Sequence, residues 1–370
     1  MISMAISASA IWGKVWPILL AILFFGLLIF LHELGHFTFA KFFGVKVNEF
    51  SMGMGPVLLK KKKKETQYSI RLFPIGGFVS MEGESENSED ERAFCNQKAW
   101  KRFIIIAAGG VVNLIMGIII LTVMLSLKTN ADGSEKLIGT REIHSFYTED
   151  AASRKYLKEG DELLKIDGKN VFSGDDINFL MQRNQTGCFD FVVLRDGKKV
   201  EVNDVQFKTS KYEFQGKERN SIVMEFYIVG VPVTFRNVVT NIIPETLTYS
   251  RLVYLSLFDL ITGTYGMSDL SGPIGTVSYI ADAAAESKKN MDWSYLCMLT
   301  GMIAINIGLF NLLPLPALDG GHLFFILIEI IFRKPVPKKL EALVHAIGMV
   351  LLLALMAVIS FSDILKLVKG

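Results

Sequence analysis

The chain has 370 residues, of which 51% are hydrophobic and 21% charged, and its mean hydropathy is positive. These values exclude a disordered or entirely water-soluble chain and indicate an integral membrane protein with one sizeable polar part. The net charge of +2 favours no class of partner, and three cysteines without paired spacing predict neither a disulfide framework nor a cysteine metal site.

The first predicted element is a transmembrane helix at about residues 15–39, long enough to cross the hydrocarbon core. It contains the sequence H-E-L-G-H from His32 to His36, and on a helix these two imidazoles lie on one face. They can hold a metal ion, with Glu33 beside them as general base. The alternative is a pair of buried histidines and a stray glutamate at a membrane interface, but ionisable groups at membrane depth are costly and usually mark function. The motif predicts a hydrolytic metal site that still lacks a third protein ligand.

The loop at residues 40–102 is strongly basic and includes five consecutive lysines at positions 60–64. Beside a membrane helix, such charge indicates the cytoplasmic face more simply than nucleic-acid binding. Residues 68–73 and 78–81 are predicted as strands joined by a sharp turn at residues 74–77. This apolar hairpin either dips back toward the active site or is an ordinary small hairpin, and the pattern leaves both open.

A second uncharged run at residues 103–127 predicts the second transmembrane helix. Its small residues allow another helix to approach closely; they are Gly109, Gly110, Asn113 and Gly117.

Residues 128–211 have the composition of a small α/β module. The stretch from Gly160 to Gly168 matches the G-D-x-[IL]-x-x-[IV]-[DN]-G signature and looks like a PDZ domain, which binds extended peptides or chain ends by adding a strand to a sheet edge. The alternative is a structural spacer. Residues 237–263 are too polar to span and predict an amphipathic helix on the membrane surface, and the glycine-rich turn at residues 270–275 is expected at the membrane interface.

A third apolar run begins at Trp293 and contains no charge before Asp319. Pro314 and Pro316 break its helix, and the backbone groups that they free are tolerated at membrane depth only beside protein or a water-filled cavity. An aspartate next to such a broken helix is the third metal ligand that we favour. The alternative role of Asp319 is to cap the following helix, and the two roles are compatible.

The last predicted span covers about residues 342–362 and follows a second short basic loop at residues 333–339. By the positive-inside rule both basic loops are cytoplasmic, so four spans place both termini and the PDZ-like module outside. His322 and His345 are alternative metal ligands, although neither has metal-ligand spacing. Judged by ligand type alone, divalent ions other than zinc could also occupy a site of two histidines and one carboxylate.

Together these motifs resemble the site-2 protease family of intramembrane zinc metalloproteases, in particular the bacterial RseP-like group with an extracytoplasmic PDZ domain. The resemblance covers nearly the whole chain. It rests on H-E-L-G-H at His32 and on N-L-L-P-L-P-A-L-D-G from Asn311, with the G-G-F hairpin, the PDZ signature and an S-G-P-I-G turn between them. The family's second span commonly carries G-P-x-x-N, which here reads G-G-V-V-N at residues 109–113, so the local helix geometry is expected to differ.

The resemblance implies that His32, His36 and Asp319 bind Zn²⁺ and that Glu33 activates the zinc-bound water. It also implies a second group of residues that hold the substrate in extended form, because a helical substrate hides its peptide bonds: Gly76, Gly77, Phe78 and Asn311.

We therefore expect an α-helical polytopic membrane protein with four transmembrane helices, a membrane-associated β-hairpin and one extracytoplasmic PDZ-like α/β domain. Its predicted parts are residues 1–127 with the first two spans and the hairpin, 128–211 with the PDZ-like domain, 212–292 with an interfacial helix and linker, and 293–370 with the last two spans. The protein is expected in the cell membrane, with its active site toward the cytoplasmic side.

The expected function is proteolysis of a transmembrane segment in a protein already shortened by a first protease. Members of the resembling group release membrane-held anti-sigma factors or clear remnant signal peptides, so regulated intramembrane proteolysis in a stress response is the expected setting. The partners are this substrate and the lipid bilayer, and no nucleic acid. The alternative is a non-catalytic membrane scaffold that captures chain ends, but such a scaffold has no need of the combined metal-site residues.

Overall fold

The computed structural model describes residues 8–84, 86–128, 135–184, 186–214, 217–262 and 272–369. The chain forms two compact units, the first of residues 1–120 and 270–370 and the second of residues 121–269. The helices are α1 (Ala8–Phe42), α2 (Ala99–Leu127), α3 (Gly174–Arg183), α4 (Phe235–Thr262), α5 (Pro273–Asn290), α6 (Ser294–Leu312), α7 (Asp319–Phe332) and α8 (Lys338–Lys369). The strands are β1 (Val47–Lys63), β2 (Thr66–Met81), β3 (Leu137–Phe146), β4 (Glu162–Ile166), β5 (Lys169–Asn170), β6 (Cys188–Arg195), β7 (Lys198–Gln206), β8 (Thr209–Phe214), β9 (Lys217–Ile222) and β10 (Phe226–Pro232).

Four helical segments are long and apolar enough to cross a membrane, in agreement with the four predicted spans. A helix suits this environment because its backbone N–H and C=O groups are paired within the segment. In order the four segments are Val15–Phe42, Ala99–Leu127, Ser294–Leu312 and Lys338–Leu365.

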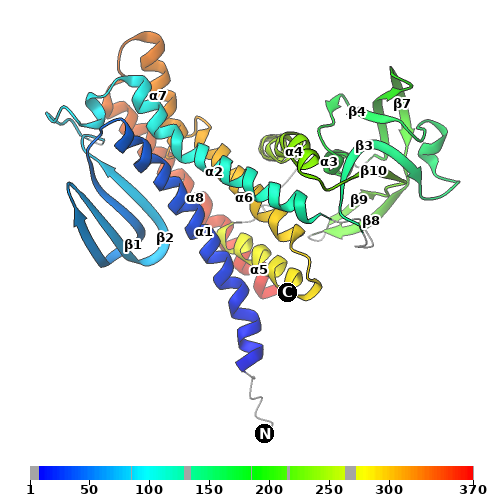
Figure 1. Ribbon diagram of the computed structural model, residues 1–370, viewed down its shortest axis with the longest axis horizontal. Helices are drawn as coiled ribbons and strands as arrows, with labels where there is room; N and C mark the ends of the chain where they lie inside the picture. Colours follow the sequence, from blue (N-terminus) through cyan, green and yellow to red (C-terminus); the bar gives the residue numbers. More distant parts are fainter. Residues whose placement is uncertain are drawn as a thin grey trace, which may run out of the picture. The chain divides into compact units, whose positions relative to one another are not determined.

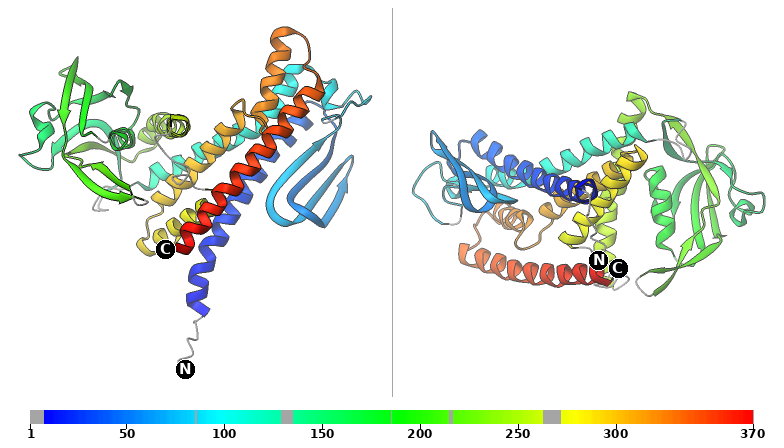
Figure 2. Two further views of the ribbon diagram at one scale, coloured as in Figure 1. Left: turned by 180° about the vertical axis from the view of Figure 1, so that it is seen from behind. Right: turned by 90° about the horizontal axis from the view of Figure 1, so that it is seen from below.

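The helices of the first unit lie side by side (Figure 1), and α2 and α6 approach each other closely at glycines. A Cβ atom on Gly308 of α6 would lie 2.8 Å from the carbonyl oxygen of Gly110 on α2, and one on Gly117 would lie 3.1 Å from that of Gly301. The predicted close approach to the second span is therefore confirmed, and α6 is the partner. α8 lies along one side of this helix group (Figure 2) and packs against α5 and α7.

The glycine-rich turn predicted at the membrane interface lies partly outside the described residues. From Gly272 onward the chain is instead the N-terminus of α5, with Pro273 in its first turn. Proline suits that position because the first backbone N–H groups of a helix have no intrahelical acceptor. α5 packs on α1 and α6, and Ile280 and Ala284 are buried in the resulting core.

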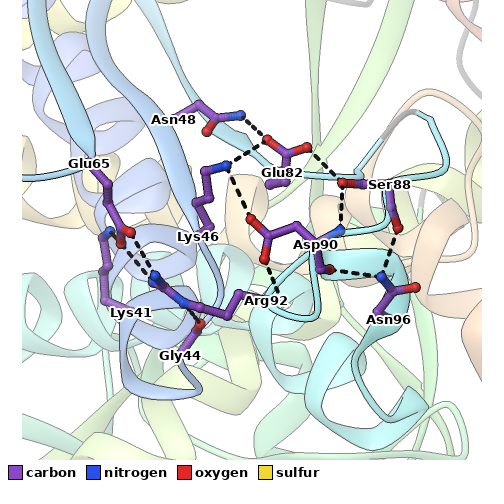
Figure 3. A network of polar contacts seen from close by, with 10 residues as sticks. All are labelled: Lys41, Gly44, Lys46, Asn48, Glu65, Glu82, Ser88, Asp90, Arg92 and Asn96. Atoms are coloured by element: carbon purple, nitrogen blue, oxygen red, sulfur yellow. Dashed lines mark hydrogen bonds and ion pairs between the residues drawn. The ribbon is translucent and has the colours of Figure 1, made fainter.

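β1 and β2 form a long hairpin beside α1 (Figure 1). The predicted change of direction near residues 74–77 is confirmed, because residues 67–70 and 77–80 pair with residues 49–52 in opposite directions and therefore lie on either side of them. The chain also reverses at Lys64, which has a φ of +54°. Glu65 at this reversal accepts hydrogen bonds from Lys41 at the end of α1 and from both terminal nitrogens of Arg92 (Figure 3). The Arg92 guanidinium and the Lys41 ammonium lower the pKa of Glu65 to about 2. This network fastens the reversal to the end of α1.

Both strands of the hairpin bend, so each contributes two limbs to the sheet. Residues 49–52 of β1 lie between two stretches of β2, residues 67–70 and 77–80. We call residues 77–81 the inner limb, since they lie against α1, and residues 57–63 the outer limb, since they pair only with residues 66–71. Gly53 and Gly55 bend β1, and Gly76 bends β2. All three have positive φ values near +90°, a conformation that only glycine adopts without strain.

The second unit is built on a six-stranded sheet in the order β10-β3-β4-β6-β7, with β5 paired to β4. Its core includes Ile143, Phe189, Phe191 and Phe226, all almost fully buried. The sheet thus takes its edge strand β10 from beyond the predicted 128–211 range. The predicted amphipathic helix is α4, which extends two residues further toward the N-terminus than expected.

α4 is held to α3 through polar side chains. Thr248 shares a hydrogen bond of 2.9 Å with Ser173, and Arg183 lies 2.5 Å from the Asp259 carboxylate. Several apolar residues of α4 remain exposed, as an amphipathic helix requires; they include Val239, Ile243 and Phe258.

Candidate active site

His32 and His36 project from one face of α1, as their four-residue spacing requires. Their Nε2 atoms lie 3.2 Å apart, and their side chains are only 12% and 8% exposed. Because this part of α1 is apolar and buried against other elements, the two imidazoles face the interior of the first unit. They provide two converging nitrogen ligands.

Asp319 is the first residue of α7 and reaches the same point from the opposite end of the sequence. Its Oδ2 atom lies 3.0 Å from His32 Nε2 and 3.2 Å from His36 Nε2. The chain can turn back here because residue 320 is glycine: a Cβ atom there would lie 1.8 Å from the carbonyl oxygen of Leu313. The N-cap residue of α7 is Leu318 and not Asp319. The Asp319 carboxylate contacts the two histidines instead.

The three ligand atoms fit one metal ion. A tetrahedral zinc with bonds of about 2.0–2.1 Å needs ligand atoms roughly 3.3 Å apart, close to the three separations of 3.0, 3.2 and 3.2 Å. Oδ2 of Asp319 is buried, yet none of the described residues donates a hydrogen bond to it. A buried carboxylate oxygen without a donor is expected to bind a cation.

α2 orients both histidines. His36 Nδ1 lies 2.9 Å from the carbonyl oxygen of Ile105, so Nδ1 carries the hydrogen and Nε2 keeps its lone pair for a metal. His32 Nδ1 lies 3.4 Å from the side-chain amide of Asn113. A metal on His32 Nε2 places the hydrogen on Nδ1, and rotating the amide by 180° lets its oxygen accept that hydrogen.

Gly109 gives these imidazoles room, since a Cβ atom at this position would lie 2.4 Å from His36 Nε2. Gly109 and Asn113 were predicted to serve helix packing, and their contacts with the histidines were not predicted. The available signal was the glycine-and-asparagine pattern at residues 109–113, which has more small and polar residues than a lipid-facing helix needs.

Glu33 lies beside the inner limb of the hairpin. The backbone of Val79 is hydrogen-bonded to the Glu33 carboxylate. A Cβ atom on Gly77 would lie 3.2 Å from Glu33 Cγ, so glycine allows the limb to pass directly over the carboxylate. The predicted general base and part of the predicted G-G-F segment are therefore adjacent.

The other predicted site residues lie in different surroundings. Gly76 lies against the Met54 side chain, and Phe78 is half-buried under the Arg71 guanidinium, 5.0 Å from its ring centroid. Asn311 is half-buried in the last turn of α6. The alternative ligands His322 and His345 stack on each other, with ring centroids 3.9 Å apart, and form a separate group with Glu341.

Sequence comparisons agree with this geometry. The model of peptidase family M50 matches residues 20–355. A protein of Clostridium acetobutylicum whose name describes a zinc metalloprotease is 35% identical over 353 residues, which cover 94% of this chain and 97% of that protein. The regulator of sigma-W protease RasP of Bacillus subtilis is 29% identical over 430 residues, covering 94% of this chain and 97% of RasP.

Proposed function

Because the chain belongs to peptidase family M50, the site-2 type zinc metalloproteases, we propose that it hydrolyses peptide bonds within transmembrane segments of other membrane proteins. The observation that carries this proposal is the position of the catalytic set. His32, His36 and Glu33 lie within the apolar span Val15–Phe42, where a soluble peptide has no ready access. A peptide that reaches them arrives through the bilayer.

The proposed roles follow from the geometry of the side chains. His32, His36 and Asp319 would hold the zinc through two Nε2 atoms and one Oδ2 atom. When bound, zinc supplies a Lewis acid that makes its water a nucleophile near neutral pH and polarises the scissile carbonyl. Glu33 accepts the proton of the attacking water and transfers it to the leaving amine. The hydrogen bond from the Val79 backbone keeps the Glu33 carboxylate in place.

The inner limb is the proposed substrate support. Its residues 77–80 pair with β1 along one edge, and Gly77 and Val79 approach Glu33. An unwound substrate segment can add to such a limb as a further strand, which exposes its peptide bonds to the catalytic residues. Gly76, Gly77 and Phe78 would shape this edge, and Asn311 would bind the substrate backbone from the end of α6.

We also propose that the second unit is the PDZ-like domain that receives chain ends. In support, the D-G turn of the signature joins β4 to β5, with positive φ at Asp167 and Gly168. A cavity of about 550 Å³ also opens between β3, the start of α3 and α4, lined in part by Gly139, Ser173 and Leu247. Chain ends produced by a first cleavage are the proposed ligands.

The relative RasP is named as a regulator of sigma-W, which supports the proposal that the substrates here are membrane-held anti-sigma factors or remnant signal peptides in a stress response. The two short basic loops support a cytoplasmic position for the catalytic end of α1. Both termini and the PDZ-like domain are then extracytoplasmic in the cell membrane.

The test is cleavage of a model transmembrane substrate by the purified full chain in detergent. Wild type is expected to cut within the apolar segment, a zinc chelator to stop the reaction, and Glu33→Gln to lower kcat by about 10²–10⁴-fold. Glu286→Gln, a change of an exposed carboxylate on α5, is the matched control. Equal rates for Glu33→Gln and wild type would refute the proposed mechanism.

A further inference from the structure

The outer limb of the hairpin combines exposed apolar and exposed basic side chains in one continuous stretch. Val57, Leu58 and Leu59 are 40%, 58% and 67% exposed. The five lysines at residues 60–64 follow directly and are all exposed. The neighbouring strand and the adjacent bend add Met54, Leu72 and Phe73 to the exposed apolar surface.

Among the described residues, no carboxylate accounts for the clustering of these five lysines. In the described part of the chain none of them forms an ion pair, whereas nearby Lys41 and Lys46 are both paired with carboxylates. The outer limb is also a sheet edge, since residues 57–63 pair with β2 on one side only. Lysines on an exposed edge discourage another strand from pairing there, and their unpaired positive charge is available to an anionic partner.

We propose that the outer limb is a binding site for anionic phospholipid headgroups that holds the hairpin at a fixed depth in the membrane. Val57, Leu58 and Leu59 enter the acyl layer, and the lysines at residues 60–64 contact the headgroup phosphates. A cluster of four to eight basic residues beside a membrane helix attracts anionic lipid by about 1 kcal/mol per residue.

The geometry of the hairpin favours lipid over other polyanions. A nucleic acid or a free phosphate would be bound by the lysines alone and would leave the adjoining apolar residues in water. The network at Glu65 fastens the reversal to Lys41 at the end of α1 (Figure 3), so the lysines begin at the end of this span. The apolar residues lie further along the limb. The limb thus passes from basic to apolar side chains, which matches the passage from charged headgroups to acyl chains in a membrane leaflet.

The proposal rests in part on the proposed function, because the outer and inner limbs belong to one sheet. Residues 66–71 bridge the outer limb to residues 49–52, and these pair with the inner limb beside Glu33. Lipid bound to the outer limb would therefore also position the inner limb, whose edge is proposed to receive the substrate.

The test uses the purified full chain in nanodiscs of phosphatidylcholine with or without phosphatidylglycerol. The variant replaces Lys60, Lys61 and Lys62 by Gln. The matched control replaces Lys98, Lys334 and Lys339, which are exposed and lie on the same proposed side of the membrane. Phosphatidylglycerol retained after transfer to detergent is measured by native mass spectrometry, and substrate cleavage is measured in parallel.

Wild type and the control are expected to retain phosphatidylglycerol, and the outer-limb variant to bind it about fivefold more weakly for each lysine removed. Equal retention by the variant and the control would overturn the proposal. So would displacement of the lipid by free glycerol phosphate, or lysine-dependent binding of an oligonucleotide without lipid retention. Lipid retention by a wild type that cleaves no substrate would leave this site standing and refute the proposed function instead.

Discussion

Oδ2 of Asp319 lies 3.0 Å from Nε2 of His32, although the two residues come from opposite ends of the chain. α1 supplies two nitrogen ligands and a carboxylate base, and α7 supplies the remaining ligand. Neither segment has a complete site alone, so the proposed centre depends on how α1, α2 and α7 pack. The first two predictions therefore concern residues of α2 that surround the site and are not themselves ligands.

Asn113→Ala is expected to weaken zinc binding by about 10–100-fold, the usual effect of removing a hydrogen-bond partner of a ligating histidine. The reason is that His32 loses the side chain that fixes its ring and tautomer. Zinc affinity is measured by competition with a chelator of known affinity. Val112→Ala, at the adjacent half-buried position, is the control, and equal losses in both variants would contradict the assigned role.

Gly109→Ala is expected to abolish zinc binding, because its Cβ atom would lie 2.4 Å from His36 Nε2. Gly110→Ala is the matched comparison: its Cβ atom would meet the flexible Leu312 side chain and the carbonyl oxygen of Gly308 instead. It is expected to lower Tm and leave zinc affinity unchanged. Metal content and thermal unfolding of the two variants separate steric damage at the site from damage to helix packing.

Glu245→Gln is expected to make the second unit less sensitive to alkaline pH. Burial and the neighbouring Asp175 carboxylate raise the pKa of Glu245 to about 8 from an ordinary value of 4.5. The folded state therefore binds a proton that the unfolded state releases, and stability falls as pH rises from about 4.5 to about 8. Between pH 5 and 8.5 the Tm of wild type should fall more than that of Glu245→Gln. The control Glu149→Gln, at an exposed position, should behave as wild type. The same dependence of Tm on pH in all three proteins would contradict the assigned role of Glu245.

Glu65→Gln is expected to loosen the hairpin reversal, because Arg92 and Lys41 lose their shared carboxylate. The side chains are partly exposed, so the free energy of unfolding should change by less than about 1 kcal/mol. Deuterium exchange at the reversal should instead become faster. The pKa of Glu65 is lowered from 4.5 to about 2, so in wild type the protection is present above pH 4.5 and is lost as pH falls toward 2. If the substitution left deuterium exchange at neutral pH unchanged, the proposed role of Glu65 in fastening the reversal would be contradicted.

The spans and the metal-binding motif were predictable because their signals are local. Four apolar runs are visible in composition, and two histidines four apart share a helix face whatever surrounds them. Asp319 was a candidate because a carboxylate beside a proline-broken apolar helix is costly at membrane depth unless it binds a cation or caps a helix. The contacts of Gly109 and Asn113 were not predictable, since they depend on which face of α2 meets α1.

The hairpin was only partly predictable from local sequence. The P-I-G-G sequence correctly predicted a change of direction near residues 74–77, but the run of five lysines gave no local sign that residues 60–63 form a strand. Long-range pairing decides the arrangement: residues 60–63 are held by residues 66–69, and residues 67–70 and 77–80 lie on either side of residues 49–52. In the same way, the glycine-rich turn gave no sign of α5, because a proline after a glycine fits a turn and the start of a helix equally well.

The most direct test of the proposed centre is the zinc content per chain, measured by elemental mass spectrometry on purified variants. Wild type, Glu33→Gln, His322→Ala and His345→Ala are predicted to hold about one zinc ion each, since none of these changes removes a ligand of the three-residue site. His32→Ala, His36→Ala and Asp319→Ala are predicted to lose it. Full zinc content in Asp319→Ala together with its loss in His345→Ala would contradict the account.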